Sequence, residues 1–411
     1  MGCSFPFSRK ESCMLIQFTV KNFKSIKDTV TLDMQAVSGI KEHRDHILEL
    51  GDDGFLPIAI IYGSNGSGKS NILKAIEIVR GMVLGRIGGG EAVPFYFSKE
   101  AVNDPCKFEI IFASNCAEYR YRLHVKEAMV VYESLDRIPR DSWHRSSLFE
   151  RKENAVTVRR VLKIATDKQD EAIDVRDNET FFGRLIRLFP ENEIINDAMN
   201  FFVSGLDFMQ EGQDADILLS DALSQEDVWD LFRSMASELD LDIVDLKVVG
   251  GKIKVTHQIG TSKYEIPLDA ESSGIRKIIY LLPVIANSLL KGQAVMLDSG
   301  MLELHPMILK HILGYYLDKS SNRKHAQLIL TSYDMITLDK DFLRRDEIWF
   351  AAKSEHQRTV LYSLADFAIE EERIKDKKYA KRYLEGVYGA DPYIRNTINW
   401  NEVFTNMGDS D

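Results

Sequence analysis

An eight-residue stretch, Gly63-Ser-Asn-Gly-Ser-Gly-Lys-Ser70, has the residue types that bind a phosphate chain. It matches the pattern G-x-x-x-x-G-K-[ST] of a phosphate-binding loop. Its three glycines allow a tight turn that points successive backbone N–H groups inward. We expect Lys69 to reach the β- and γ-phosphates and the Ser70 hydroxyl to be a magnesium ligand. The stretch therefore predicts binding of a nucleoside triphosphate with Mg²⁺.

The residues on either side predict the elements that hold this loop. The apolar, β-branched run at 56–62 is typical of a buried strand, and Asn71–Ile76 has the pattern of a helix start. Such a helix presents the positive end of its dipole to the phosphates. A glycine-rich turn without a ligand is the alternative, and the complete motif between a strand and a helix argues against it.

Two later apolar runs end in polar residues suited to the same chemistry. The run Ala294–Leu297 is followed by Asp298, and a carboxylate in this position orients a magnesium-bound water. A second run starts at Gln327, about thirty residues after Asp298, and leads to Tyr333 and Asp334. We therefore predict Ser70 and Asp298 as the residues that hold the metal ion.

A short polar segment, Ser272-Ser273-Gly274, precedes a long apolar helix. Hydroxyl and backbone N–H groups at a helix N-terminus can bind a phosphate. An ordinary capped helix start is the alternative. The position of the segment about twenty-five residues before Asp298 favours the phosphate contact.

The remaining pattern predicts an α/β fold with a mixed central sheet and an antiparallel β subdomain. Alternating runs at 15–20 and 29–34 indicate a hairpin, and strands then follow one another without helices. These successive strands are expected at 106–113, 118–125, 128–135 and 156–164. Runs at 346–350 and 358–362 have the look of edge strands.

Four parts of the chain follow from this pattern. They are an N-terminal tail (1–13), a first part of the nucleotide-binding head (14–167), a helical insertion (168–243) and a second part of the head (244–411). The insertion carries apolar residues at helical spacing, including 194–206. Its aromatic residues are expected in the core rather than at a ligand site, and they are Phe181, Phe182, Phe201, Phe202 and Phe208.

Composition narrows the class of protein. The chain has 411 residues, a net charge of −11 and four cysteines without a metal-type or disulfide pattern, so the cytoplasm is the expected compartment. No apolar run approaches the length of a membrane span. The acidity argues against a broadly basic DNA-coating protein. His43 and His46 have no evident third partner for a metal, so we expect them on a solvated surface.

These motifs, taken in order, resemble the RecF/SMC-like ABC ATPases of the bacterial OLD-like and abortive-infection group. The resemblance spans nearly the whole chain from Met14. It is carried by the start Phe18–Ser25, the phosphate loop, Glu271–Lys277, Asp298 with Leu304-His305-Pro306, Thr331–Asp334 and the closing segment Lys381–Pro392.

The resemblance implies ATP as the nucleotide and a head-to-tail homodimer, or a higher homo-oligomer, with ATP buried between protomers. A second subunit would present Ser272 and Gly274 to the γ-phosphate, while Asn22 and Lys24 would lie near the nucleotide. The predicted ATP-binding residues are Gly63, Ser64, Asn65, Gly66, Ser67, Gly68, Lys69, Ser70, Asn71, Asn22, Lys24, Ser272, Gly274 and Tyr333.

Two departures from the family pattern affect residues that take part in hydrolysis. Ser299 stands where ABC-type ATPases usually have glutamate, and Tyr333 stands where they have a switch histidine. A hydroxyl cannot act as a general base at neutral pH, and loss of such a group slows chemistry roughly a hundred-fold or more. Asp334 or Glu303 would have to supply the carboxylate, so Lys69, Asp298 and Asp334 are the predicted catalytic residues. A slow ATPase is expected, and a non-hydrolysing ATP sensor is the alternative.

The resemblance also implies a role in anti-phage defence. The segment after Asp366 is too short for the nuclease domain that OLD-like proteins often carry, so an effector nuclease or toxin is expected in trans. One alternative is a RecF-like DNA-binding repair clamp that uses Lys21, Lys24, Lys27, Arg159, Arg160 and Lys163. A transporter motor is a weaker alternative, because no Q-loop glutamine is apparent.

Overall fold

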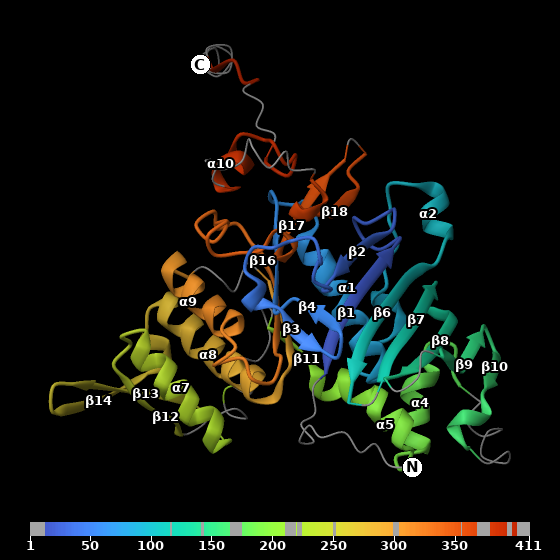
Figure 1. Cartoon of the computed structure of the whole chain (residues 1–411), viewed down its shortest axis with the longest axis horizontal. Helices are drawn as coiled ribbons and strands as arrows, with labels where there is room; N and C mark the ends of the chain where they lie inside the picture. Colours follow the sequence, from blue (N-terminus) through green and yellow to red (C-terminus); the bar gives the residue numbers. More distant parts are fainter. Residues whose placement is uncertain are drawn as a thin grey trace, which may run out of the picture.

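The protein is described from a computed structural model (Figure 1). The description covers residues 13–115, 117–140, 144–164, 175–209, 219, 224–249, 252–298, 304–354, 356–367, 379–392 and 397–400. Two large sheets form the body, and helices α7, α8 and α9 lie together on one side of it (Figure 1). The predicted class, α/β with a mixed central sheet and an antiparallel β subdomain, is confirmed.

The first sheet is antiparallel and has seven strands in the order β10-β9-β8-β7-β6-β1-β2. Its alternation is clearest in β7, where every second residue is buried, as expected for a sheet with one face on the core. The bounds are β1 Met14–Lys21, β2 Val30–Asp33, β6 Cys106–Ser114, β7 Ala117–Lys126, β8 Met129–Pro139, β9 Ser146–Lys152 and β10 Ala155–Val158. The strand expected at 156–164 ends early, because a 3₁₀ turn begins at Arg160.

The second sheet has six strands in the order β11-β15-β16-β5-β17-β18. All neighbours pair in parallel except β17 and β18. The bounds are β5 Ile58–Tyr62, β11 Leu206–Met209, β15 Ala294–Leu297, β16 Gln327–Ser332, β17 Ile348–Lys353 and β18 Thr359–Ser363. Every residue of β5, β15 and β16 is buried, which explains their continuous apolar character.

One expectation for this sheet was wrong. Strand β17 is not at an edge, because it lies between β5 and β18. The apolar run at 194–206 is helical as expected through Gly205, where α5 continues as a π-helical turn at Phe201–Gly205 and leads into β11. Since β11 pairs with β15, the segment 168–243 contributes a strand to the central sheet as well as helices.

The remaining elements cover these sheets. The helices are α1 Lys69–Val83, α2 Lys99–Asn103, α4 Phe181–Leu188, α5 Glu193–Asn200, α7 Glu226–Glu238, α8 Ser273–Lys291, α9 Pro306–Leu317 and α10 Tyr379–Leu384. A three-stranded antiparallel sheet of β12 Ile243–Val249, β13 Lys252–Ile259 and β14 Ser262–Pro267 projects beside α7, and β3 Leu48–Leu50 pairs with β4 Asp53–Phe55 (Figure 1).

Helix α8 is long and apolar enough, by length and composition alone, to cross a membrane. Half of its most apolar window is buried inside the protein, where it packs against α7 and β15. The helix continues through Pro283, which is itself buried. These contacts are those of a core helix.

Polar side chains tie the two sheets together. The buried Gln327 amide donates to the carbonyls of Leu15 and Leu56 at 3.1 Å, and its oxygen accepts from the Leu15 N–H at 2.7 Å. The five aromatic residues expected in the core are all buried, as predicted. The β subdomain and the sheet that carries the phosphate loop therefore share one core.

Candidate nucleotide-binding site

The strand order places the predicted motifs at one edge of the central sheet. Strand β16 lies between β5 and β15, and all three run in the same direction. The phosphate loop follows β5, Asp298 follows β15 and Tyr333 follows β16. Ligands of open parallel sheets bind at the carboxyl ends of their strands, where these three segments meet.

Glycine is required at two positions of the loop by close packing. Gly63 has φ of 154°, and a Cβ there would lie 2.2 Å from the carbonyl oxygen of Ala351 in β17. Gly68 has φ of 102°, and its Cβ would lie 2.0 Å from Thr359 Oγ1 and 2.7 Å from Ser25 Oγ. Helix α1 begins directly after Gly68, so its unpaired N–H groups face the loop.

Lys69 lies inside the loop and is only 3% exposed. Its Nζ donates to the carbonyl oxygens of Gly63 at 2.7 Å and Ser64 at 3.0 Å. Burial lowers the pKa of the Lys69 ammonium to about 8, and the charge of Asp298 opposes this shift. The side chain is therefore held across the loop, with an ammonium that a phosphate would stabilise.

Tyr333, the residue in the switch position, covers the same lysine. Lys69 Nζ lies 3.8 Å from the centre of its ring, in cation–π geometry. The ring is half exposed. In this structure Tyr333 therefore contacts the lysine of the phosphate loop directly.

Asp298 lies at the end of β15 and is held by the neighbouring strand. The Thr331 hydroxyl of β16 donates to Asp298 Oδ1 at 2.6 Å. The Ser70 hydroxyl is exposed at the start of α1. A hydroxyl and a carboxylate are the hard oxygen ligands that Mg²⁺ prefers, so this pair fits the metal of an ATP complex.

The Asp334 carboxylate is held by two backbone N–H groups of the turn that follows it. Oδ1 accepts from the Ile336 N–H at 2.9 Å and Oδ2 accepts from the Thr337 N–H at 3.1 Å. Both carboxylate oxygens thus cap the turn after β16. The other carboxylate considered, Glu303, and the substituted Ser299 lie outside the described residues.

The two residues of the N-terminal turn that the resemblance places near the nucleotide have contacts within the protein. Asn22 is buried, and its amide donates to the carbonyls of Ala101 and Asp104 and accepts from the Phe95 N–H. This side chain clamps the 95–104 segment, so its amide is already engaged within the protein. Lys24 Nζ lies 5.6 Å from the Phe23 ring.

Three residues absent from the predicted set contact the loop. Thr359 of β18 donates to the Ser67 carbonyl at 2.8 Å, and its hydroxyl pairs with that of Ser25 at 2.7 Å. The Asn71 amide donates to the same Ser25 hydroxyl. Lys353 Nζ would lie 3.5 Å from a Cβ at Gly66, so it provides a second ammonium beside the loop. Thr359 and Lys353 stand in otherwise ordinary strands, and Ser25 was noted only as the end of the segment Phe18–Ser25.

The closing segment also reaches the loop. The carbonyl of Ala390 accepts from the Ser64 N–H at 3.1 Å, and Ala390 is buried. The resemblance in the segment Lys381–Pro392 therefore has a structural basis in packing against the phosphate loop.

Ser272 and Gly274 lie at the start of α8. Ser272 is exposed and caps the helix, since its Oγ accepts from the Ile275 N–H at 3.2 Å. A Cβ on Gly274 would meet no atom within 4 Å. Among the residues that the structure describes, no hydrogen bond joins Ser272 or Gly274 to the phosphate loop.

Comparison with known structures returned SMC head domains, which share 14% of aligned residues with this chain. The SMC head domain from Thermotoga maritima covers 85% of this chain and 98% of its own length with a TM-score of 0.42. The SmcHead bound to the C-winged helix domain of ScpA covers 87% and 99% with a TM-score of 0.49. The Smc head domain bound to the C-terminal domain of ScpA derived from Pyrococcus furiosus covers 92% and 100% with a TM-score of 0.45.

No curated protein matched the sequence. A family model described as "AAA domain, putative AbiEii toxin, Type IV TA system" matches residues 58–339. The match runs from β5 and the phosphate loop past Asp298 and Tyr333, so it spans the whole edge of the sheet described above. This chain belongs to that family and carries an ATPase-type AAA domain.

Proposed function

We propose that the protein is an ABC-type ATPase subunit that binds ATP with Mg²⁺, dimerises around the nucleotide and hydrolyses it slowly. The observation that carries the proposal is Lys69, which is buried across the phosphate loop and faces both Asp298 and Tyr333. Gly63–Ser70 and Asn71 would cradle the phosphates. Ser70 and Asp298 would hold Mg²⁺, whose chemistry is to neutralise charge on the transferred phosphate.

Helix α8 supports the dimer. Glycine inside a helix is less stable than alanine, by about 0.5–1 kcal/mol in the helix interior. Gly274 has open space around it and no need of a positive φ, so nothing in the described part of its own chain requires glycine. We infer that a second protomer's nucleotide approaches the backbone of Ser272 and Gly274.

Slow turnover follows from the residues near the γ-phosphate. Tyr333 occupies the switch position and contacts Lys69, and Asp334 is the described carboxylate closest in sequence to that position. Asp334 would have to leave its turn to orient a water, which makes hydrolysis conditional on a movement of the segment after β16. A non-hydrolysing ATP sensor is the alternative within the same fold.

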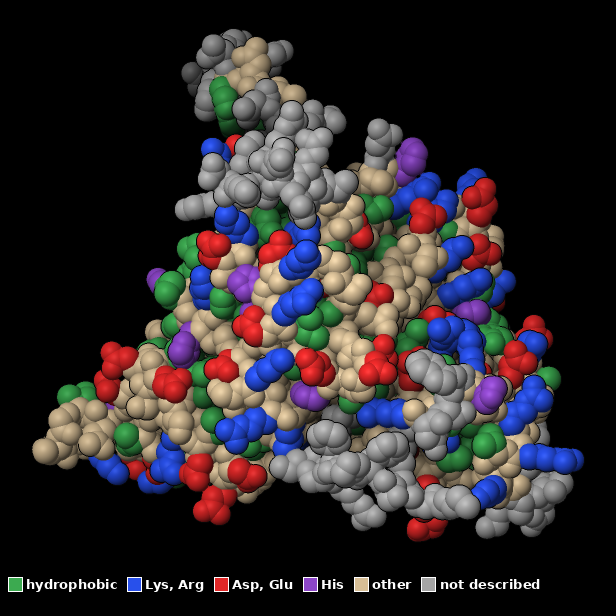
Figure 2. All heavy atoms as spheres, viewed as in Figure 1, with side chains coloured by type: hydrophobic (Ala, Val, Ile, Leu, Met, Phe, Trp, Pro, Cys, Tyr) green, Lys and Arg blue, Asp and Glu red, His purple; other side chains and the backbone are tan. Residues whose placement is uncertain are grey.

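The family description, with its toxin and toxin–antitoxin terms, supports a role in prokaryotic anti-phage defence. We propose that the ATP-bound dimer acts in the cytoplasm and controls an effector nuclease or toxin in trans. The DNA-clamp alternative needs a broad basic surface. On the face in Figure 2, basic and acidic side chains are interspersed, and the net charge of −11 does not favour nucleic acid.

The test is the mass of the full-length protein by light scattering, with and without ATP and Mg²⁺, together with ATP turnover. Wild type should become a dimer with ATP, and Lys69→Ala should remain a monomer that binds ATP only weakly. Gly274→Ala should bind ATP as wild type does and yet remain a monomer. A wild-type protein that stays monomeric at saturating ATP would contradict the proposed dimer. A Gly274→Ala protein that dimerises normally would contradict the contact inferred at Gly274.

A further inference from the structure

The turn between β2 and β3 brings together three side chains that can ligate a metal. His43, Asp45 and His46 each offer a ligand atom, and these atoms lie within 4.8 Å of one another. His43 has φ of 46° and is followed by the 3₁₀ turn Arg44–His46. Residues three apart eclipse in such a turn, so the two imidazole rings stack with centroids 4.8 Å apart.

This placement corrects the expectation that both histidines lie on a solvated surface. His46 is buried, and His43 is half-buried. The third partner that the sequence did not reveal is Asp45, which is exposed. Among the described residues, no hydrogen bond or ion pair engages the Asp45 carboxylate.

Each ring has one nitrogen held by an acceptor outside the turn. His43 Nε2 lies 3.0 Å from the carbonyl oxygen of Lys340. A carbonyl can only accept, so Nε2 carries the hydrogen and Nδ1 keeps its lone pair. His46 Nδ1 lies 3.1 Å from Glu347 Oε1, and donation to this carboxylate leaves the lone pair of His46 on Nε2.

These outside partners are the arrangement that orients metal-bound histidines. A ligating histidine almost always donates its other N–H to a carboxylate or a backbone carbonyl, which fixes the tautomer and makes the free nitrogen more basic. Here His46 has the carboxylate partner and His43 has the backbone carbonyl partner. Glu347 is itself fully buried and fixed by the Arg344 N–H at 2.8 Å.

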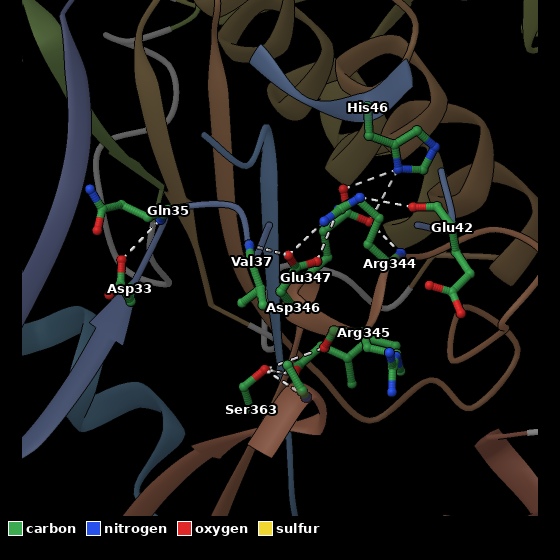
Figure 3. A network of polar contacts seen from close by, with 12 residues as sticks. Asp33, Gln35, Val37, Glu42, His46, Arg344, Arg345, Asp346, Glu347 and Ser363 are labelled. Atoms are coloured by element: carbon green, nitrogen blue, oxygen red, sulfur yellow. Dashed lines mark hydrogen bonds and ion pairs between the residues drawn. The ribbon is translucent and has the colours of Figure 1, made fainter. Parts of the chain in front are cut away.

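A wider polar network surrounds Glu347 (Figure 3). The buried Arg344 guanidinium donates to both carboxylate oxygens of Asp346 and to the Glu42 carbonyl. Asp346 in turn accepts from the Val37 N–H at 2.8 Å. In Figure 3 the Glu42 carboxylate points away from His46. Glu347, the acceptor of His46, therefore lies within a buried polar network.

We propose that His43 Nδ1, Asp45 and His46 Nε2 bind a divalent transition-metal ion, with Zn²⁺ as the preferred ion. Imidazole nitrogens with one carboxylate suit Zn²⁺ and related first-row ions, whereas Mg²⁺ prefers oxygen ligands alone. Tetrahedral bonds of about 2.0–2.1 Å place ligand atoms roughly 3.3 Å apart. The ligand atoms now lie within 4.8 Å of one another, so movements of the exposed Asp45 side chain and of the histidine rings would close the site to that spacing.

Such an ion would stabilise the contact between two connecting segments of the chain. The turn 43–46 belongs to the link between β2 and β3, while Lys340 and Glu347 belong to the link between β16 and β17. The second link begins with Tyr333, so the ion anchors the far end of the segment that follows the switch position. The ion is separate from the Mg²⁺ of the nucleotide site.

The experiment measures Zn²⁺ binding to the full-length protein without a histidine tag, by competition with a chromophoric chelator in excess Mg²⁺. Wild type is expected to bind one ion per chain. His43→Ala and Asp45→Asn should each bind Zn²⁺ at least about 100-fold more weakly than wild type. Even the loss of an outer-shell partner typically costs 10–100-fold in metal affinity. The matched control is Glu42→Gln, which removes a carboxylate of the same loop and should bind as wild type.

Co²⁺ gives a second readout, since its visible absorption should show nitrogen ligation in wild type and change in Asp45→Asn. Asp45 is exposed and His43 is half-buried, so these variants remain folded even where His46→Ala does not. Wild type that binds no Zn²⁺, or variants and wild type that bind it equally, would overturn the proposal.

Discussion

Lys69 Nζ lies 3.8 Å from the centre of the Tyr333 ring while it donates to two carbonyl oxygens of its own loop. The lysine that should meet the phosphates is thus already engaged. In the proposed ATP complex, the phosphates would replace the tyrosine ring and at least one of the carbonyls. Loss of the contact between Lys69 and Tyr333 would then reduce the free energy gained on nucleotide binding.

Tyr333→Ala should bind ATP more tightly than wild type. A cation–π contact contributes about 0.5–2 kcal/mol, so its loss from the free protein corresponds to roughly 2- to 30-fold in affinity. The ring is half exposed, which favours the lower part of this range. Titration with a fluorescent ATP analogue measures the change, with Tyr333→Phe as the control that keeps the ring. Weaker binding by both variants would instead assign the hydroxyl to the phosphates.

The affinity for ATP should fall as the pH rises above about 8. Burial lowers the pKa of Lys69 from 10.5 to about 8, so the free protein loses this positive charge above that pH. Since the phosphates bind the protonated form, affinity should decline by up to tenfold per pH unit over the next unit or two. Calorimetric titrations at pH 7, 8 and 9 test this. Lys69→Ala should show weak binding without the step, and a flat wild-type profile would contradict the shift.

The order and spacing of motifs were enough to predict the class of the fold and the three buried strands whose following segments meet at one edge of the central sheet. Buried parallel strands are near-continuous apolar runs, so β5, β15 and β16 could be recognised in the sequence. The residues that follow such strands lie together at the carboxyl edge of the sheet. Residues 206–209 were missed because a four-residue strand directly after a helix has too short a pattern. Ser25, Thr359 and Lys353 were missed because their contacts join segments far apart in the sequence, which no local pattern records.

Loss of the Asp334 carboxylate should slow hydrolysis while ATP binding is retained. We expect Asp334→Asn to lower the turnover rate about 100-fold or more, if the residue orients the attacking water as proposed. The amide keeps one acceptor for the turn, so the Ile336 or Thr337 N–H loses its partner and stability falls by only about 1 kcal/mol. Single-turnover ATP cleavage separates the two effects. The control is Asp339→Asn, farther along the same link, and equal turnover by both variants would restrict Asp334 to its capping role.

Glu133 should be a main determinant of stability in the β subdomain. Its fully buried carboxylate accepts from the N–H groups of Phe181 at 2.6 Å and Phe182 at 2.9 Å, one on each oxygen, and from the Tyr121 hydroxyl at 2.8 Å. Glu133→Gln keeps the shape but turns an NH₂ group toward one of these backbone donors. An unsatisfied buried donor costs about 1–3 kcal/mol, and the start of α4 also loses a negative charge that its dipole favours.

Urea unfolding of Glu133→Gln should therefore show a lower midpoint at an unchanged slope. The matched control is Glu150→Gln on the adjacent strand β9, where the half-buried carboxylate pairs with Lys152 and accepts from the Tyr132 hydroxyl at 3.3 Å. A partly exposed pair of this kind contributes at most about 1 kcal/mol. The difference between the two variants isolates the helix-capping role of Glu133, because both substitutions remove one charge from the same sheet. Equal midpoints would mean that Phe181 and Phe182 hold α4 in place by packing alone.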